Sequence, residues 1–298
     1  MLVTQSELFV AEKPTDLKRM SVNVASVPQR SLFRYPGGKT WFVPTFRRWI
    51  AQSVLKPKML IEPFAGGGII SLTAVCEGLV DHAVLIELDE DVASVWRIII
   101  EGKSEALAKR ILNFQLSLES VQRELERPLN DLEDRAFRTI LKNRTFHGGI
   151  LAAGSGLIKN GEAGKGISSR WYPETLARRL QTLNLVRHKL SIFVGDALIL
   201  ASDYLDDKSA WFFIDPPYTA GGKNAGKRLY THFELDHAKL FDLCSQMKGE
   251  FLMTYDNADE VAALAQSKKF DTRLIPMKNT HHAEMTELIV GKKLGWLD

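Results

Sequence analysis

The sequence predicts an α/β protein whose core is a mostly parallel sheet of seven strands. Seven short runs rich in β-branched and aromatic residues recur along the chain. They occupy residues 59–63, 83–87, 191–195, 211–215, 251–255, 272–276 and 287–291. Stretches with helical periodicity separate most of these runs, at 69–79, 89–100, 196–205, 234–247 and 257–266. Because strands that alternate with helices usually pair in the same direction, we expect a mainly parallel sheet.

The last two predicted strands have no room for a helix between them. Only residues 277–286 connect them. Parallel neighbours need a crossover of about a dozen residues or more, whereas a short connection joins antiparallel strands. We therefore expect an antiparallel hairpin at the edge of the sheet.

The alternation of strands and helices fails between about Glu101 and Lys189. Helical stretches there flank a glycine-rich basic loop at 147–166, and long loops of this kind are usually functional. We interpret the region as an insertion that recognises a partner. The predicted division is an N-terminal extension at 1–30, a catalytic domain at 31–105 and 188–298, and a recognition insertion at 106–187.

The composition is that of a soluble globular protein, with 45% apolar and 25% charged residues. The two cysteines, Cys76 and Cys244, lie far apart in apolar surroundings without metal-ligand spacing, so we expect buried thiols in a reducing compartment. No apolar stretch approaches the roughly 18 residues of a membrane span, and the first residues lack the basic start of a secretory signal. We predict a cytoplasmic protein without membrane contact.

The net charge of +3 says little about partners, but the charge is unevenly distributed. Between Leu141 and Leu190, nine basic residues accompany two acidic ones, which gives +7 in this block and −4 in the rest of the chain. A basic block inside a mildly acidic chain favours a surface that binds a polyanion. A solvated basic face is the alternative.

The first predicted strand ends in a glycine-rich turn, EPFAGGG at 62–68, which leads into a helix. Nucleotide-binding α/β folds place such a turn against the ligand, although tight turns also need glycine where no ligand binds. The next strand ends at Glu87, roughly 20 residues later, where an acid can accept hydrogen bonds from ribose hydroxyls. The chain lacks G-x-x-x-x-G-K-[ST] and a true G-x-G-x-x-G, so a nucleoside without phosphates fits better than NAD.

The strongest motif is Asp215-Pro216-Pro217-Tyr218, which follows a predicted strand at the place where open α/β sheets hold their ligands. Asp215 and the Pro216 carbonyl can accept the two N–H bonds of an exocyclic ring amine such as that of adenine. The prolines keep these acceptors in place, and the Tyr218 ring can stack on a base turned out of a duplex. The carboxylate can also stabilise positive charge that develops on the nitrogen. The alternative is a rigid turn in which Asp215 caps a helix and Tyr218 packs.

Six sequence elements in this order resemble those of the Dam-type DNA adenine methyltransferases, the D12 class or alpha group. They are RYPGGK at 34–39, EPFAGGG at 62–68, LIELDED at 85–91, NRTFHGG at 143–149, GDA at 195–197 and FIDPPY at 213–218. The resemblance covers most of the chain after residue 30. It implies a Rossmann-like, S-adenosylmethionine-dependent enzyme that flips adenine out of double-stranded DNA at specific sites and methylates its N6.

The resemblance also implies which residues form the site, with 106–187 as the target-recognition region. The expected catalytic residues are Asp215, Pro216, Pro217 and Tyr218. The expected cofactor-binding residues are Tyr35, Gly37, Gly38, Lys39, Glu62, Pro63, Phe64, Ala65, Gly66, Gly67, Glu87, Leu88, Asp196, Ala197 and Asp215. The expected DNA-binding residues are Lys142, Asn143, Arg144, Lys159, Lys165 and Arg170. Two positions depart from the family: Tyr35 stands where tryptophan is frequent, and Glu87 replaces the more usual aspartate.

The expected cofactor is S-adenosylmethionine, which leaves as S-adenosylhomocysteine. No metal is expected, because the histidines, including His281 and His282, show no ligand spacing. The expected partner is double-stranded DNA, with association with the nucleoid during use. A cognate restriction endonuclease or an orphan enzyme both stay open, as do a monomer and a weak dimer.

Other interpretations of the same residues remain. The D/N-P-P-Y motif serves planar amines and amides generally, so methylation of cytosine N4, of RNA or of a protein amide is the alternative activity. A catalytically silent DNA-binding module is the alternative class. Arg144 fits a guanine edge, a phosphate or a salt bridge inside the insertion. Tyr230 and Phe233, which follow the basic loop at 221–228, fit either the target pocket or the core.

Overall fold

The computed structural model describes residues 26–35, 37–161, 164–218, 229–232, 234–278 and 284–297. Outside this range lie most of the N-terminal extension (1–25), the basic loop at 221–228, Phe233 and the His281–His282 pair. None of the helices in these described segments is long and apolar enough to span a membrane.

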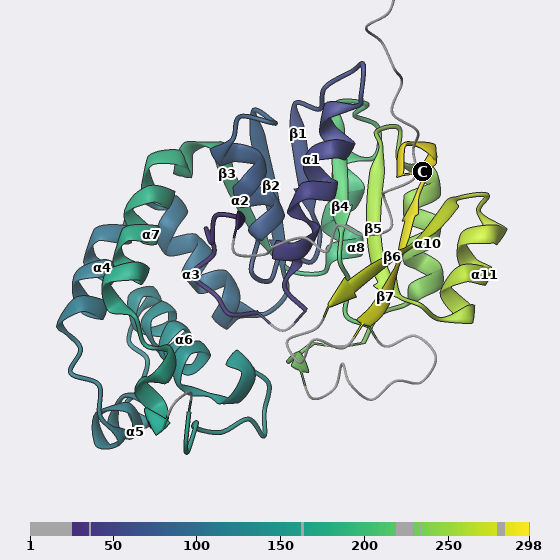
Figure 1. Cartoon of the computed structure of the whole chain (residues 1–298). Helices are drawn as coiled ribbons and strands as arrows, with labels where there is room; N and C mark the ends of the chain where they lie inside the picture. The colour runs from purple at the N-terminus through teal and green to yellow at the C-terminus, as the bar shows by residue number, and fades with distance from the viewer. Residues whose placement is uncertain are drawn as a thin grey trace, which may run out of the picture.

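A sheet with strand order β3-β2-β1-β4-β5-β7-β6 forms the centre of the molecule in the described part of the chain (Figure 1). Its strands are β1 (Met59–Glu62), β2 (His82–Glu87), β3 (Leu190–Val194), β4 (Ala210–Ile214), β5 (Phe251–Asp256), β6 (Asp271–Lys278) and β7 (Glu284–Gly291). The first five strands pair in parallel, whereas β7 runs antiparallel to both β5 and β6. The predicted parallel sheet and its antiparallel edge hairpin are confirmed.

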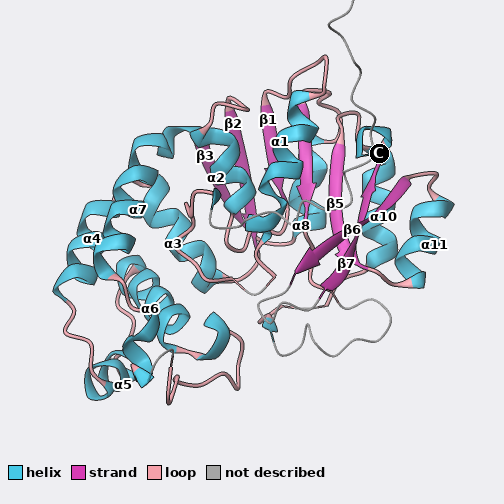
Figure 2. Ribbon diagram, in the orientation of Figure 1, coloured by secondary structure: helices cyan, strands magenta, loops and turns pink. Residues whose placement is uncertain are grey.

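Two apolar cores lie on opposite faces of the sheet, because neighbouring side chains of a strand point to opposite sides. On β1, Leu60 belongs to one core and Ile61 to the other. Helices cover both faces (Figure 2). The first core is closed by α1 (Val43–Ala51), α2 (Ile69–Cys76) and α3 (Glu90–Ile100), and the second by α8 (Ala197–Leu200), α10 (His237–Gln246) and α11 (Asp259–Ser267).

The insertion is helical, as expected. In the described residues it contains α4 (Ser104–Asn113), α5 (Leu118–Glu126), α6 (Leu132–Thr145) and α7 (Pro173–Val186). Helix α6 packs on α3, and α4 packs on α7, so the insertion extends the first core and has no separate one. The division of the chain at residues 106 and 187 stays a prediction.

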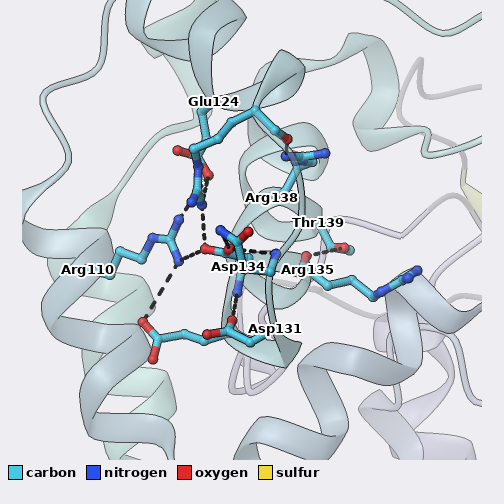
Figure 3. Close-up of polar contacts among 10 residues, drawn as sticks. Arg110, Glu124, Asp131, Asp134, Arg135, Arg138 and Thr139 are labelled. Atoms are coloured by element: carbon cyan, nitrogen blue, oxygen red, sulfur yellow. Dashed lines mark hydrogen bonds and ion pairs between the residues drawn. The ribbon is translucent and has the colours of Figure 1, made fainter.

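Charged side chains join α4, α5 and α6 in the part of the insertion shown in Figure 3. Asp134 on α6 accepts hydrogen bonds from Arg110 of α4 at 2.9 Å and from Arg127, which follows α5. Glu124 of α5 accepts from the same two arginines, at 2.9 Å and 3.0 Å. The Arg110 guanidinium also lies 4.3 Å from the centre of the Phe137 ring. Each of these charges therefore has an opposite charge beside it.

Two local elements differ from the sequence expectation. Helix α1 was not predicted, although its buried residues Val43, Phe46 and Ile50 have helical spacing and Pro44 lies in its first turn. The helix expected at 196–205 is the short α8 followed by a 3-10 turn at Ala201–Tyr204. Both elements still cover the faces of the sheet that their apolar residues require.

Candidate active site

A cavity of about 1210 Å³ opens where β1, β2 and β4 end. Strand β1 lies between β2 and β4, and open α/β sheets bind ligands at the point where the strand order reverses in this way. The volume exceeds the roughly 300–1,000 Å³ of a typical small-molecule pocket, so it can hold a cofactor and a second group. The predicted site residues that line it are Tyr35, Gly37, Gly38, Lys39, Glu62, Pro63, Phe64, Ala65, Gly66, Gly67, Glu87, Leu88, Ala197, Asp215, Pro217, Arg144 and Arg170.

Asp215 follows β4 directly and is held from three sides at one carboxylate oxygen. Its Oδ1 accepts from the Thr254 hydroxyl at 2.8 Å and from the Tyr218 hydroxyl at 2.9 Å. The Lys39 ammonium lies 2.9 Å from the same oxygen. Among the described residues, these contacts all go to Oδ1, and the side chain keeps 21% exposure to the cavity. The carboxylate is therefore fixed in orientation without acting as a helix cap.

Lys39 connects Asp215 to a second acid, Glu287 of β7. Its ammonium lies 3.4 Å from Glu287 Oε1 and also donates to the Gly37 carbonyl at 2.9 Å. Burial alone would lower the pKa of Lys39, but the two carboxylates outweigh it and the pKa is raised. Burial raises the pKa of Glu287 to about 7, against the opposing effect of Lys39. Lys39 is thus a buried cation that is fully compensated by acids.

Tyr218 is occupied by contacts within the protein. Its hydroxyl lies 2.9 Å from Asp215 and 3.3 Å from Glu287. Its ring stacks on Tyr255 at 5.8 Å between centroids, and the Lys39 ammonium lies 5.0 Å from the ring centre. The expected stacking of Tyr218 on a target base requires the ring to leave these contacts. In this structure Tyr218 acts on Asp215 by orienting it.

The glycine turn after β1 is packed against Tyr35. Gly66 has φ +44°, and a Cβ there would lie 2.7 Å from the Tyr35 ring. Gly68 has φ +60°, and the Gly66 carbonyl accepts from the Trp96 indole at 3.1 Å. A side chain at Gly66 would clash with the Tyr35 ring. The turn therefore needs glycine for close approach as well as for its backbone angle.

Two buried acids lie beside this turn. Glu87, at the end of β2, accepts from the backbone N–H of Gly66 at 2.8 Å and of Asp89 at 2.9 Å. Glu62 accepts from the Ser71 N–H at 3.1 Å. Burial raises the pKa of Glu87 to about 7 and that of Glu62 to about 8. Glu87 therefore links the glycine turn, through one oxygen, to the start of α3, through the other.

Asp196 lies outside the residues that line the cavity. It is exposed at the N-terminus of α8, where its carboxylate accepts from the Leu198 N–H at 2.7 Å. A helix cap of this kind satisfies a backbone donor that would otherwise lack a partner. Ala197, the next residue, does line the cavity. A cofactor role for Asp196 stays a prediction.

The predicted DNA-binding residue Asn143 is fully buried. Its amide oxygen accepts from the Arg34 N–H at 2.8 Å, and its amide nitrogen donates to the carbonyls of Arg34 and Gly149 at 3.1 Å and 2.8 Å. All its polar atoms are therefore used within the protein. In this structure it has no surface for DNA, and it ties α6 to the segment before Lys39 instead.

The remaining predicted DNA-binding residues are spread over the insertion. Lys142 lies 3.7 Å from Asp91 of α3. Lys159 and Lys165 are exposed, and Arg170 is half-buried between the large cavity and a smaller one of about 430 Å³. Arg144 is 5% exposed and donates to the Leu32 carbonyl, so its side chain forms part of the cavity wall.

The site also contains residues that the sequence did not indicate. Glu287 of β7 accepts from the Tyr218 hydroxyl, and the Thr254 hydroxyl of β5 donates to Asp215. Arg179 of α7 lines the cavity beside Arg144. An acid inside the apolar run ELIVG at 287–291 was the available signal for Glu287. Among the described residues, no group of His, Cys, Asp or Glu is arranged to hold a metal.

A match to a family model identifies the protein family of this chain. The model of the D12 class N6 adenine-specific DNA methyltransferases matches residues 35–282. The chain belongs to this family. It is therefore an S-adenosylmethionine-dependent DNA adenine methyltransferase, and the resemblance inferred from the six motifs is confirmed.

Solved structures with a similar fold are also methyltransferases, but the likeness is distant. The rRNA methyltransferase aviRa of Streptomyces viridochromogenes has a TM-score of 0.43 and 11% identity, over 93% of this chain and 95% of its own. The precorrin-6y C5,15-methyltransferase of Geobacter metallireducens has a TM-score of 0.32 and 8% identity, over 83% and 84%. These likenesses do not bear on the substrate of this chain. The sequence matches no curated protein.

The described residues fit the methyl donor of the family. The glycine turn at Gly66 and Gly67 lines the cavity, and Glu87 lies beside it at the end of the next strand. These features suit a nucleoside without phosphates. S-adenosylmethionine supplies the electrophilic methyl group when it is bound.

Proposed function

We propose that this methyltransferase acts on adenine N6 at specific sites in double-stranded DNA, with the target base rotated out of the helix into the cavity. The placement of Asp215 supports this proposal most strongly. Its carboxylate lies at the carboxyl end of β4, faces the cavity, and is fixed by Lys39, Thr254 and Tyr218. A base inside a duplex cannot reach such a recess, so enzymes that modify bases turn them out.

In the proposed mechanism, Asp215 and the Pro216 carbonyl accept the two N–H bonds of the adenine amine. Because the three donors bind Oδ1, the Oδ2 atom is the one that meets the amine. The lone pair of this amine is delocalised into the ring, and fixing both N–H groups directs the lone pair toward the methyl donor. The carboxylate then stabilises the positive charge that develops on N6, and its fixed orientation removes the need for reorganisation during the reaction.

Lys39, Tyr218 and Thr254 act in this proposal by positioning Asp215. Glu287 shares Lys39 with Asp215 and keeps the ammonium between the two acids. The segments at 35–39 and 62–67, with Glu87, Leu88 and Ala197, hold the cofactor. The exposed Lys159 and Lys165 of the insertion contact the DNA backbone.

The decisive experiment is the Asp215→Ala variant, assayed by transfer of a tritiated methyl group to mixed-sequence DNA. We expect the rate to fall by about 10²–10³-fold or more, because a preorganised electrostatic contact with the reacting nitrogen is removed. The control is Asp203→Ala, which alters an exposed aspartate outside the cavity and should leave the rate unchanged. Urea unfolding curves check that both variants are folded. Full activity in a folded Asp215→Ala variant would disprove the mechanism.

Digestion of the methylated DNA to nucleosides, followed by mass spectrometry, tests the base. N6-methyladenine supports the proposal, whereas N4-methylcytosine or an unmodified product contradicts it. Mapping modified positions on genomic DNA then gives the recognition site. We propose that no metal takes part, so EDTA should leave the rate unchanged. Cleavage assays on DNA without the modification test whether a restriction endonuclease shares the mapped site, and sedimentation distinguishes a monomer from a weak dimer.

A further inference from the structure

Two arginines in the cavity wall have no acidic partner among the described residues. Arg144 of α6 donates to the Leu32 carbonyl, and Arg179 of α7 donates to the Ser31 carbonyl at 2.6 Å. Within the described segments, neither guanidinium forms an ion pair with a carboxylate. Arg144 is only 5% exposed, and its buried Nε has no hydrogen-bond partner in the described part of the chain. Both side chains line the same cavity as Asp215.

Further positive charges lie near Arg144 and add to its uncompensated charge. Burial, followed by the nearby cations Arg179, Arg34 and Arg170, lowers the pKa of Arg144 to about 9. All four arginines line the cavity. A cation that is removed from water without an opposite charge is strongly disfavoured. An anion that enters the cavity beside Arg144 and Arg179 would therefore stabilise this arrangement.

We propose that Arg144 and Arg179 form a phosphate-binding subsite that holds a phosphodiester group of the DNA next to the target adenine. This proposal rests on the proposed function, because a base turned out of the duplex brings its own backbone toward the cavity. The planar guanidinium presents a fork of N–H donors that matches phosphate oxygens. Two backbone carbonyls, of Ser31 and Leu32, hold the forks in place before the ligand arrives.

The carboxylate of the methyl donor is the other oxyanion with the same chemistry. The subsite lies on the insertion helices α6 and α7, whereas the residues proposed for the cofactor lie on the segment 35–39 and at the ends of β1 and β2. This separation favours the DNA phosphate. The two sources predict different effects of replacing Arg179. If the subsite holds a DNA phosphate, the affinity for DNA depends on Arg179, whereas a subsite for the donor carboxylate makes the affinity for the cofactor depend on it.

The test compares Arg179→Gln with Arg178→Gln, an exposed neighbour on α7 that does not line the cavity. Binding of a fluorescent duplex is measured by anisotropy over a series of salt concentrations. We expect Arg179→Gln to weaken binding about tenfold and to reduce the slope of log K against log salt by about 1, as for one lost phosphate contact. Arg178→Gln should keep the slope of the unaltered protein, and cofactor affinity, measured by calorimetry, should be unchanged in both.

Two outcomes would overturn the proposal. One is a loss of cofactor affinity in Arg179→Gln with an unchanged DNA salt slope, which would assign the subsite to the carboxylate of the donor. The other is equal behaviour of the two variants in both measurements. Arg144→Met provides a second variant with the same expected loss of slope, and urea unfolding confirms that each variant is folded.

A probe without DNA separates this proposal from the proposed function. Inorganic phosphate, compared with chloride at equal ionic strength, should raise the Tm of the unaltered protein and not that of Arg179→Gln. This readout involves no methyl transfer, so it stands even if the enzyme proves to methylate a different base. Equal Tm values in phosphate and chloride would contradict a built phosphate subsite.

Discussion

The insertion contains two groups of arginines whose charges have opposite surroundings. In the network of α4, α5 and α6, Arg110 and Arg127 share the acids Asp134 and Glu124 (Figure 3). In the cavity wall, Arg144 donates only to a backbone carbonyl in the described structure. The same residue type is thus compensated in one region and left uncompensated in the other.

The difference indicates which charges serve the fold and which serve a ligand. A paired network contributes to stability once its partners are in place, and it is strongly damaged when one partner is removed. An unpaired buried cation has no such contribution and is disfavoured until an anion binds. On this argument, the outer network fixes the shape of the insertion, while the cavity wall keeps charge available for DNA.

The largest expected effect comes from breaking the paired group. Asp134→Ala removes the acid that Arg110 and Arg127 share and that Asn130 also contacts at 3.0 Å. We expect the free energy of unfolding to fall by about 3 kcal/mol, because hydrogen bonds to a buried carboxylate are lost while both arginines keep Glu124. Urea unfolding measures this change in the free energy of unfolding. The matched control is Arg123→Ala, whose ion pair with Glu119 is exposed and should contribute less than about 1 kcal/mol. Equal effects of the two variants would remove the distinction.

The fold could be predicted from sequence because its signals are local. Continuous apolar runs such as 211–215, and the short connection at 277–286, define strands and their direction without knowledge of distant contacts. The motif at Asp215 was equally local, since a rigid turn directly after a strand places its own acid at the cavity. The structure then adds Lys39 and Tyr218 at hydrogen-bond distance.

The rest of the site could not be predicted because it depends on register between distant segments. Thr254 contacts Asp215, and Glu287 contacts Tyr218, only because β5 pairs with β4 and with β7. Asn143 shows the opposite case. The family resemblance implied that it contacts DNA, but in the structure its amide bonds to Arg34 and Gly149. The sequence shows where polar side chains occur, but only the packing shows which of them can still contact a ligand.

Glu62 extends the comparison from arginines to an acid, because it is buried without an ion pair among the described residues. Burial raises its pKa to about 8 from an ordinary value near 4.5. The folded protein therefore keeps a proton that the unfolded chain loses, so this residue makes stability fall as pH rises from about 4.5 to 8. In Glu62→Gln, whose amide oxygen can still accept from Ser71, this fall is absent. We expect the variant to gain roughly 2–3 kcal/mol relative to the unaltered protein between pH 5 and pH 8.

Urea unfolding at pH 5, 6.5 and 8 measures this gain. Glu105→Gln is a suitable control, because Glu105 is exposed in the first turn of α4 and should give a small, constant difference. A difference between Glu62→Gln and the unaltered protein that does not change with pH would show that the buried acid has an ordinary pKa.

The smallest and most discriminating effect is expected for Arg144→Met. If the cation were part of the fold in the way that Arg110 is, its removal would destabilise the protein. Because it lacks an acid, an apolar side chain of similar length should remove a desolvation penalty that exceeds the value of its bond to Leu32. We therefore expect the free energy of unfolding without DNA to rise by about 1 kcal/mol, measured by urea unfolding, while the affinity for duplex DNA falls. A loss of stability comparable to that of Asp134→Ala would show instead that both arginine groups serve the fold.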